Sequence, residues 1–199
     1  MAEQFSVEER ILNAFLQLVT QRGLIATTTS ALAEAADVNE VTIFRHFKDK
    51  QSLVHALFEH YDLVGRINDY HLSIDTSSPE SVASGLFDCL VYLRNTLREL
   101  APLLQFSISE FWKFPEVKQE SALAPQAARK LIESALDQAQ PQLRWDIDLE
   151  STTLSLMGLL LITVLWNQNQ WLSLSEHAWN DKLKSAIRPL LKTQERNSF

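Results

Sequence analysis

The chain has 199 residues, of which 46% are hydrophobic, and it carries a formal net charge of −7. This length allows one or two domains with a sizeable core, and the single cysteine, Cys89, excludes an internal disulfide. The chain has only four glycines and shows neither alternating Val/Ile/Thr runs nor hairpin dipeptides, so the composition argues against a β-sheet protein. We therefore expect an all-α protein in a reducing cytoplasm.

A first amphipathic helix is predicted from Val7 to Arg22. Ser6 and Glu9 have the spacing of a capping box, and Gly23 supplies the stop. Apolar residues recur along one face at helical spacing: Ile11, Ala14, Phe15, Leu18 and Val19. The segment lacks the basic start and the unbroken apolar run of a signal peptide. We expect this helix to buttress the two short helices that follow.

Two short helices and the start of a third are predicted next, and a residue suited to capping precedes each one. Thr28, Asn39 and Asp49 can each accept a hydrogen bond from a free backbone N–H of the first turn. A tight turn at 36–38 joins the first two helices. The second runs to about Arg45, and its residues divide into an inward pair, Val38 and Ile43, and an outward set, Val41, Thr42 and Arg45. The arrangement predicts a helix-turn-helix that holds one short helix at the surface, as in proteins that read the DNA major groove.

The helix-turn-helix segment resembles the signature of the tetracycline-repressor (TetR) family of bacterial regulators. The resemblance extends over roughly 11–58, under a third of the chain. It rests on these residues at their spacing: Gly23, Thr27, Thr28, Leu32, Ala33, Ala36, Val38, Thr42, Ile43, Phe44, His46, Phe47, Lys50 and Leu53. It implies an N-terminal DNA-binding domain at 1–50, a helical ligand-binding and dimerisation domain at 51–199, and a homodimer bound to a two-fold operator.

The resemblance also implies roles for single residues. Phosphates would be held by Thr28, His46 and Lys50, and base edges would be read by Val41, Thr42 and Arg45. Lys50 is electrostatically awkward at the start of a helix unless an anion such as a phosphate binds there. Half-sites would lie about 34–36 Å apart, or a multiple of that distance.

Two positions depart from the family pattern. Asp37 stands in the turn where the family has glycine, and aspartate tolerates the left-handed conformation at a modest cost. Phe44 stands where the family has a tyrosine whose hydroxyl contacts phosphate, so one hydrogen bond per subunit is missing. Residues 1–60 hold five lysines and arginines against eight aspartates and glutamates, a net of −3. Any positive patch must therefore be local. The departures at Asp37 and Phe44 both predict weaker DNA binding than a consensus member shows.

The rest of the chain is predicted to be helical. A polar joint at 73–79 precedes a helix that Ser78 caps, and leucines recur along it at steps of three and four: Leu86, Leu90, Leu93, Leu97 and Leu100. A short helix starts at Pro102, and another runs from about 126 to 140. Asp148 caps a long apolar helix to about 171, and Ser175 begins the last helix.

The long apolar helix has a run at 157–166 with no charged residue, which is too short for a membrane span of about 20 residues. A helix that is apolar on all sides is buried on all sides, so we expect the last helix to cover one face and a second copy to cover the other. The alternative is an internal core helix. The predicted dimer interface consists of Leu154, Ser155, Gly158, Ile162, Leu183 and Ile187.

Aromatic residues are frequent in this region. The resemblance implies a ligand cavity there, and we assign to it Tyr92, Phe106, Phe111, Trp112, Trp145 and Trp166. The alternative is ordinary core. Because no charged cluster identifies the ligand, a hydrophobic or aromatic compound is inferred from composition alone.

Catalysis, metals and cofactors receive no support from the sequence. His55 and Glu59 lie four residues apart on a predicted helix, with His60 beside them, but two or three such groups without further ligands predict surface histidines. Cys89 lies in an apolar helix with no basic neighbour, which predicts a buried, unreactive thiol.

Taken together, the sequence predicts a cytoplasmic transcriptional regulator with three partners: double-stranded DNA, a second copy of itself and a small-molecule effector. Two alternatives remain open. One is a helical ligand-binding or interaction protein whose helix-turn-helix no longer binds DNA, and the other is an enzyme on a helical fold.

Overall fold

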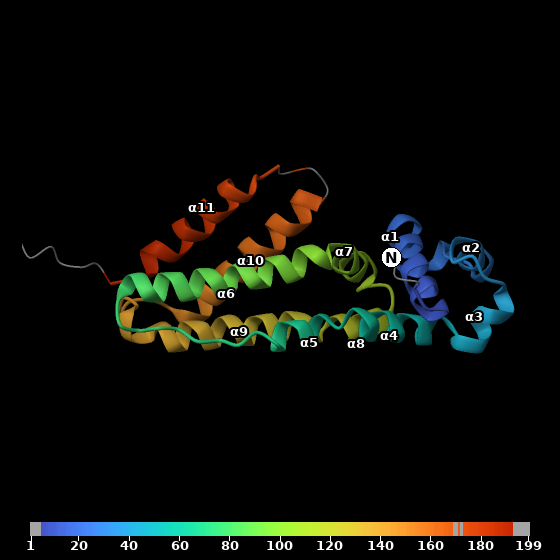
Figure 1. The fold of residues 1–199 in the computed structure, drawn as a ribbon, viewed down its shortest axis with the longest axis horizontal. Helices are drawn as coiled ribbons and strands as arrows, with labels where there is room; N and C mark the ends of the chain where they lie inside the picture. The colour runs from blue at the N-terminus through green and yellow to red at the C-terminus, as the bar shows by residue number, and fades with distance from the viewer. Residues whose placement is uncertain (1–4, 169–170, 172, 193–199) are drawn as a thin grey trace, which may run out of the picture. The chain divides into compact units, whose positions relative to one another are not determined.

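The computed structural model describes residues 5–168, 171 and 173–192, and in this part of the chain every regular element is helical. Outside the helices, one isolated bridge joins Leu143 to Leu191. The predicted all-α fold is confirmed. The described residues form eleven α-helices, and Figure 1 shows their order along the chain. By packing, the described residues form two compact units: residues up to Leu63 with Leu100–Ala124, and Val64–Glu99 with the residues from Pro125 onward.

The first unit contains four N-terminal helices and two that come from the middle of the chain. They are α1 (Val7–Ala26), α2 (Thr29–Ala35), α3 (Glu40–His46), α4 (Lys50–Tyr61), α7 (Ala101–Glu110) and α8 (Pro115–Ser121). The Ser6–Glu9 capping box is present, and Gly23 interrupts α1 with a φ of 80°. Helix α7 packs against α1, and α8 packs against α4. Phe106 of α7 therefore lies in the same core as Phe15 of α1.

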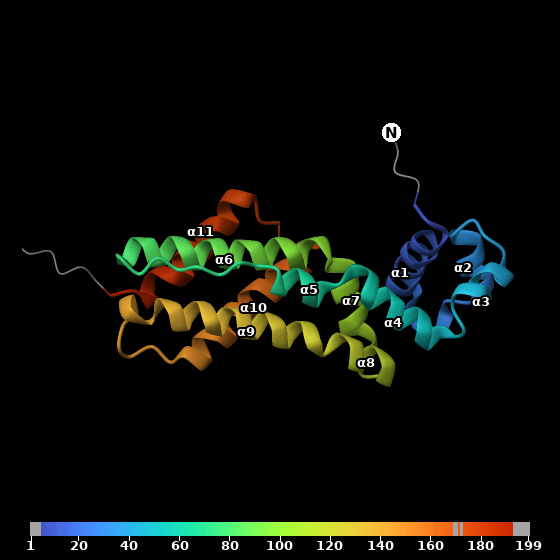
Figure 2. The ribbon, with the colours of Figure 1, turned by 60° about the horizontal axis from the view of Figure 1, so that its bottom comes forward.

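The second unit is built around α6 (Pro79–Glu99), which α10 (Leu149–Gln168) and α11 (Glu176–Ile187) contact. Figures 1 and 2 show both of these helices against α6. The remaining elements include α5 (Leu63–Asn68), at the boundary between the units, and α9 (Leu123–Ala139), most of which belongs to the second unit. Two short 3-10 helices follow α9 and α11, at Gln140–Gln142 and Arg188–Leu190.

The predicted leucine seam of α6 is buried in the protein. Ser78, Asp148 and Ser175 accept hydrogen bonds at the starts of α6, α10 and α11, as the sequence predicts. The long apolar helix ends at Gln168, and its predicted extension toward 171 falls partly on residues outside the described set. Cys89 is buried within α6, and burial raises the pKa of its thiol to about 12. The thiol is therefore protonated at neutral pH.

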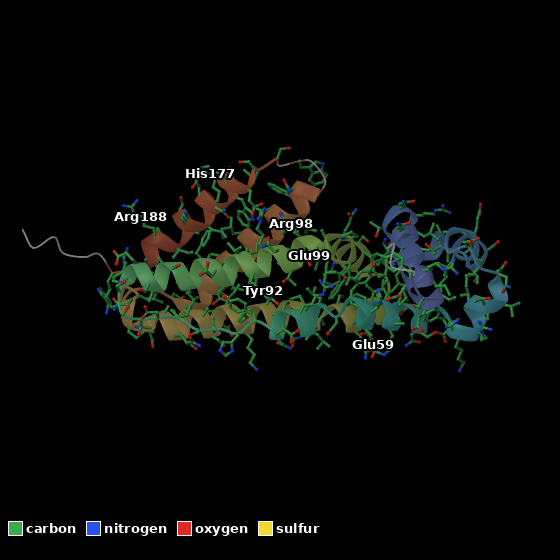
Figure 3. The ribbon with its side chains drawn as sticks, viewed as in Figure 1. Glu59, Tyr92, Arg98, Glu99, His177 and Arg188 are labelled. Atoms are coloured by element: carbon green, nitrogen blue, oxygen red, sulfur yellow. The ribbon has the colours of Figure 1, made fainter. Side chains whose placement is uncertain are left out.

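An ion pair fixes the start of α11 on α6. The buried Arg94 guanidinium lies 2.5 Å from the Glu176 carboxylate and 4.8 Å from the centre of the Trp179 ring. Arg98, marked in Figure 3, approaches the same carboxylate at 3.3 Å. The hydrogen bond from Arg94, with the charges of both arginines, holds the pKa of Glu176 below its usual value. These contacts hold α11 against α6, which α10 also contacts. One face of α10 is exposed within the protomer.

Candidate nucleic-acid interface

The turn between α2 and α3 is fixed by backbone conformation and by an arginine from α1. Asp37 has a φ of 53°, a left-handed conformation that aspartate tolerates. Arg10 donates from Nη1 to the carbonyl oxygens of Ala36 and Asp37, at 3.0 and 3.3 Å. These carbonyls lie past the end of α2, where no helical N–H is available to them. Arg10 thus ties the helix-turn-helix to its supporting helix.

Helix α3 is capped and oriented as the sequence predicts. The Asn39 side-chain oxygen accepts from the Thr42 backbone N–H at 2.8 Å. Ile43 is buried against the core of the first unit, whereas Val41 and Arg45 are exposed. The turn and the cap therefore present one defined face of a seven-residue helix to solvent.

Two more predicted positions lie near the start of α4. Asp49 and Ser52 form a capping box, and the hydrogen bond from the Ser52 backbone N–H lowers the pKa of Asp49. The Lys50 ammonium donates to the carbonyl oxygen of Leu24 at 2.9 Å and to that of Ile25 at 3.4 Å. This cation is already bound to the end of α1 without DNA, and its phosphate contact stays a prediction.

The predicted DNA-binding residues all belong to the first unit, where they lie on α3, at its N-cap and at the starts of α2 and α4. All are exposed except Thr42, which is half-buried: Thr28, Asn39, Val41, Thr42, Phe44, Arg45, His46 and Lys50. Thr28 accepts from the Ala31 N–H, so it caps α2 as predicted. The Thr42 hydroxyl donates to the side-chain oxygen of Asn39 at 2.8 Å, so its proton is already used in a hydrogen bond within the protein.

Sequence reasoning missed the role of Arg10. The residue was counted only as one of five N-terminal cations, because a hydrogen bond across 26 or 27 residues leaves no local pattern. The available signal was its place in the first turn of an amphipathic helix, where an arginine side chain can reach along the surface toward a neighbouring element. Arg10 also lies 3.7 Å from the Asp37 carboxylate, an exposed and weak contact.

The six predicted pocket residues are divided between the two units. Three belong to each unit, with Phe106, Phe111 and Trp112 in the first and Tyr92, Trp145 and Trp166 in the second. Phe106 is fully buried in the core of the first unit, and Trp112 is 85% exposed beside the Phe111 ring. The Tyr92 hydroxyl donates to the Arg66 carbonyl. Only Trp145 lines a large groove of the second unit.

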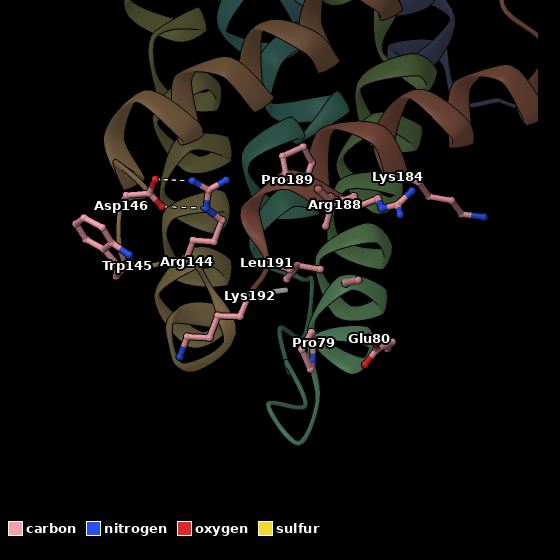
Figure 4. A pocket seen from close by; sticks show the side chains of 12 residues that line it. Pro79, Glu80, Arg144, Trp145, Asp146, Lys184, Arg188, Pro189, Leu191 and Lys192 are labelled. Carbon is pink, nitrogen blue, oxygen red and sulfur yellow. Dashed lines mark hydrogen bonds and ion pairs between the residues drawn. The ribbon is translucent and has the colours of Figure 1, made fainter. Parts of the chain in front are cut away.

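That groove, the Trp145 groove, has a volume of about 1210 Å³ and is shown in Figure 4. Trp145 is 95% exposed, in a turn that the ion pair between Arg144 and Asp146 closes. Its walls combine apolar side chains with both signs of charge, with cations in excess: Pro79, Glu80, Ala83, Arg144, Trp145, Asp146, Lys184, Ile187, Arg188, Pro189, Leu191 and Lys192.

The predicted dimer residues separate into two groups. Leu154, Ser155, Gly158 and Ile162 are exposed on α10. Leu183 and Ile187 are 0% and 2% exposed, so they are core residues of the protomer and are not available to a partner. They were assigned to the interface because apolar residues on α11 cannot be divided by sequence between a core and a partner. In the structure, α11 packs against α6 and buries both side chains.

His55 joins two elements of the first unit. Its Nδ1 lies 2.8 Å from the Glu120 carboxylate of α8, and its Nε2 lies 3.4 Å from Glu59 on α4. Within the part of the chain that the structure describes, no three His, Cys, Asp or Glu side chains are placed to hold a metal ion. His55, Glu59 and Glu120 therefore form a contact between α4 and α8.

Known proteins share this domain and this fold. Residues 11–57 match the family described as bacterial regulatory proteins, tetR family. Over 128 residues the chain is 34% identical to the uncharacterized HTH-type transcriptional regulator YvkB of Bacillus subtilis (strain 168), which covers 62% of each protein. Over 156 residues it is 29% identical to the HTH-type transcriptional regulator AcrR of Shigella flexneri, covering 78% of this chain and 71% of AcrR. The chain thus spans less than two thirds of the length of YvkB.

A solved structure extends the likeness beyond the N-terminal domain. The TetR family transcriptional regulator PfmR from Thermus thermophilus has a TM-score of 0.71 to this chain at 16% identity. The superposition covers 92% of this chain and 100% of PfmR. At this identity the likeness shows that the fold is shared over nearly the whole chain.

Proposed function

The chain belongs to the TetR family of bacterial regulatory proteins, and we propose that it is a cytoplasmic transcription regulator that binds a two-fold operator as a homodimer and responds to a small molecule. The observation that carries the proposal is the presentation of α3. Asn39 caps this helix, Ile43 anchors it, and the Arg10 contacts fix the turn before it. A short helix held in this way can enter the major groove without first being ordered, so binding loses little conformational entropy.

The dimer proposal rests on the exposed stripe of α10. It consists of Ser151, Leu154, Ser155, Gly158, Leu161, Ile162 and Trp166, which recur at helical spacing. A contiguous apolar stripe of this kind marks an interaction surface. A second copy that packs the same stripe against it would form a two-fold interface, as expected for most homodimers.

The same helix also has the length and composition of a membrane span. Within the described residues, Leu149–Asn167 has a mean hydropathy of 1.6, so the sequence-based argument that the apolar run is too short does not exclude a span. The face that carries Thr153, Leu156 and Leu160 is buried in the protomer. The exposed stripe includes two serines and a glycine, which suit close helix packing, and we therefore propose a protein partner for it.

The Trp145 groove supports the effector proposal. It is large enough to admit a small organic compound, and Trp145 offers an aromatic surface for stacking. Arg188 and Lys184 add positive charge, a feature that the sequence-based inference of a hydrophobic or aromatic compound did not include. We propose an aromatic compound that carries an acidic group, because such a molecule uses both features of the groove.

The connection between the units offers a route from effector to DNA. The chain passes between them at 63–64, 99–100 and 124–125, and the middle segment places α7 on α1 and α8 on α4. A compound that favours one arrangement of the second unit would act on the first unit through these covalent links. The DNA would then change the affinity for the compound by the same factor.

A mobility-shift assay at low and moderate salt tests the function directly, with DNA selected from a random library by the purified protein. Retarded, sequence-dependent complexes are expected. If no sequence is enriched and no shift appears at low salt, the alternative holds: a helical ligand-binding or interaction protein without DNA binding.

Lys50→Ala tests the phosphate contact at the start of α4. If Lys50 exchanges its carbonyl partners for a phosphate, the slope of log affinity against log salt should fall by about 1 per contact, or about 2 for a dimer. Lys130→Ala removes an exposed cation from α9 and serves as the matched control. Fluorescence anisotropy from about 50 to 300 mM salt gives both slopes. A slope unchanged by Lys50→Ala would show that the ammonium only supports the end of α1.

The contact between α4 and α8 should depend on pH. The hydrogen bond to Glu120, followed by the charges of Glu120 and Glu59, raises the pKa of His55 above its ordinary value. A raised folded-state pKa means that protonated His55 stabilises the first unit fully below the unfolded pKa of about 6.5, and that this contribution is lost as pH rises through the folded pKa.

The measurement is urea unfolding at pH 6.0 and pH 8.5 for the wild type and Glu120→Gln. The variant should be less stable than the wild type at pH 6.0, and the difference should shrink at pH 8.5. Glu116→Gln, on the same helix, is the control and should give a difference that does not vary with pH. An equal loss for Glu120→Gln at both pH values would contradict the ionic part of this contact.

A further inference from the structure

The exposed face of α3 carries two large apolar side chains. Val41 is 76% exposed and Phe44 is 58% exposed. They lie three residues apart on the helix, so their side chains are neighbours on one surface. Helix α3 buries Ile43 on its opposite side, which shows that the exposed pair is not needed for the core of the first unit. A valine and a phenylalanine left in solvent together can gain free energy by burial against an apolar surface.

Few polar side chains near Val41 and Phe44 are placed to contact base edges. Thr42 donates its hydroxyl proton to Asn39 and is half-buried, so it is poorly placed to donate to a base. Arg45 is exposed and remains able to donate to a base edge or a phosphate. Glu40 is also exposed, and its carboxylate repels phosphates while suiting the positive end of α3. The exposed face of α3 is therefore more apolar than expected from the predicted base contacts of Val41, Thr42 and Arg45.

The local charge limits what phosphate contacts can contribute. Residues 1–60 have a net charge of −3, and the lysines and arginines on α3 or just after it are Arg45, Lys48 and Lys50. Lys50 already donates to two carbonyl oxygens. Phe44 has no hydroxyl and cannot donate to a phosphate. With a weak ionic contribution, tight binding requires a larger share from apolar contacts with the bases.

The C5-methyl of thymine is the apolar group that a base pair presents in the major groove. We propose that Val41 and Phe44 select the operator by packing on thymine methyl groups, with Arg45, His46 and Lys48 near the flanking backbone. This inference rests on the proposed function and names the feature of DNA that the protein recognises. It assigns Phe44 a specificity role in place of the phosphate contact that a tyrosine makes there.

Replacing thymine by uracil tests the proposal, because it removes only the methyl group. The best duplex selected from a random library is compared with duplexes in which each thymine pair related by the two-fold axis becomes uracil. At one or more such pairs per operator the affinity should fall about fourfold for each methyl lost, or roughly 15-fold for the pair. Fluorescence anisotropy at fixed salt measures the affinities.

Protein variants then assign the methyl contacts. Phe44→Ala and Val41→Ala should weaken binding to the thymine duplex and abolish the uracil effect at the pairs they contact, whereas Phe44→Leu should keep part of it. Lys48→Ala is the matched control, and it should weaken binding to the thymine and uracil duplexes equally. Both apolar residues are exposed, so their variants should unfold at the wild-type temperature.

Different results would overturn the methyl contacts and the proposed function. If no sequence is enriched from the library, the protein does not read DNA, and both this inference and the proposed function are overturned. If a sequence is enriched but uracil changes nothing, or the uracil effect persists in the Val41→Ala, Phe44→Ala double variant, the methyl readout is overturned and the proposed function stands.

Discussion

Gly158→Arg should convert the proposed dimer into a monomer and reduce operator affinity at least about 100-fold. A Cβ added at Gly158 meets nothing within 4 Å in the protomer, so the new side chain has room in a single copy. In a two-fold dimer through the exposed stripe of α10, the same position would place two arginines in a desolvated interface. A buried charge without a partner costs several kcal/mol. Each monomer would then hold one half-site alone and lose the gain from binding two together.

Light scattering and anisotropy measure this effect together. The wild type should have a mass twice that of one chain, which is 22.7 kDa, and Gly158→Arg should have the mass of a single chain. Gln126→Arg adds the same charge at an exposed position of α9 and should stay dimeric with unchanged affinity. Circular dichroism should show the wild-type helix content in both variants. A Gly158→Arg protein that remains a dimer would place the interface away from this stripe.

The local features of the fold could be predicted from sequence because short-range hydrogen bonds decide them. Ser6, Thr28, Asn39 and Asp49 each accept from a backbone N–H three residues later, a spacing that is visible in the sequence. The left-handed turn at Asp37 fits the sequence as well, because aspartate is among the few residues that tolerate that conformation. For the recognition helix, local rules therefore gave its limits, its caps and its exposed face.

The long-range features could not be predicted in this way. The functional division at residue 50 stays a prediction, but the packing boundaries fall elsewhere, because 100–124 returns to the first unit. Apolar residues at helical spacing show that a face is buried, not which element covers it. Leu183 and Ile187 were assigned to a partner for this reason, and the Arg10 contacts with the turn were missed.

Phe106 gives the sharpest test of how the middle segment packs. The sequence placed this residue in an effector pocket, whereas the structure buries it completely in the core of the first unit, where its ring lies 6.4 Å from that of Phe58. Phe106→Ala should therefore destabilise the protein by about 3–5 kcal/mol, through lost burial and the cavity left behind. Operator binding should fall with it, because α7 supports α1.

Urea unfolding followed by circular dichroism measures the loss, with Trp112→Ala as the control. Trp112 lies in the same segment but is 85% exposed, so its removal should change stability by no more than about 0.5 kcal/mol. Phe106→Leu should cost less than Phe106→Ala, because it keeps most of the apolar volume. If Phe106 lined a ligand cavity, Phe106→Ala would enlarge that cavity at little cost in stability and alter the affinity for hydrophobic compounds. A loss below about 1 kcal/mol together with such a change would restore Phe106 to a pocket and remove it from the core that supports the DNA-reading helices.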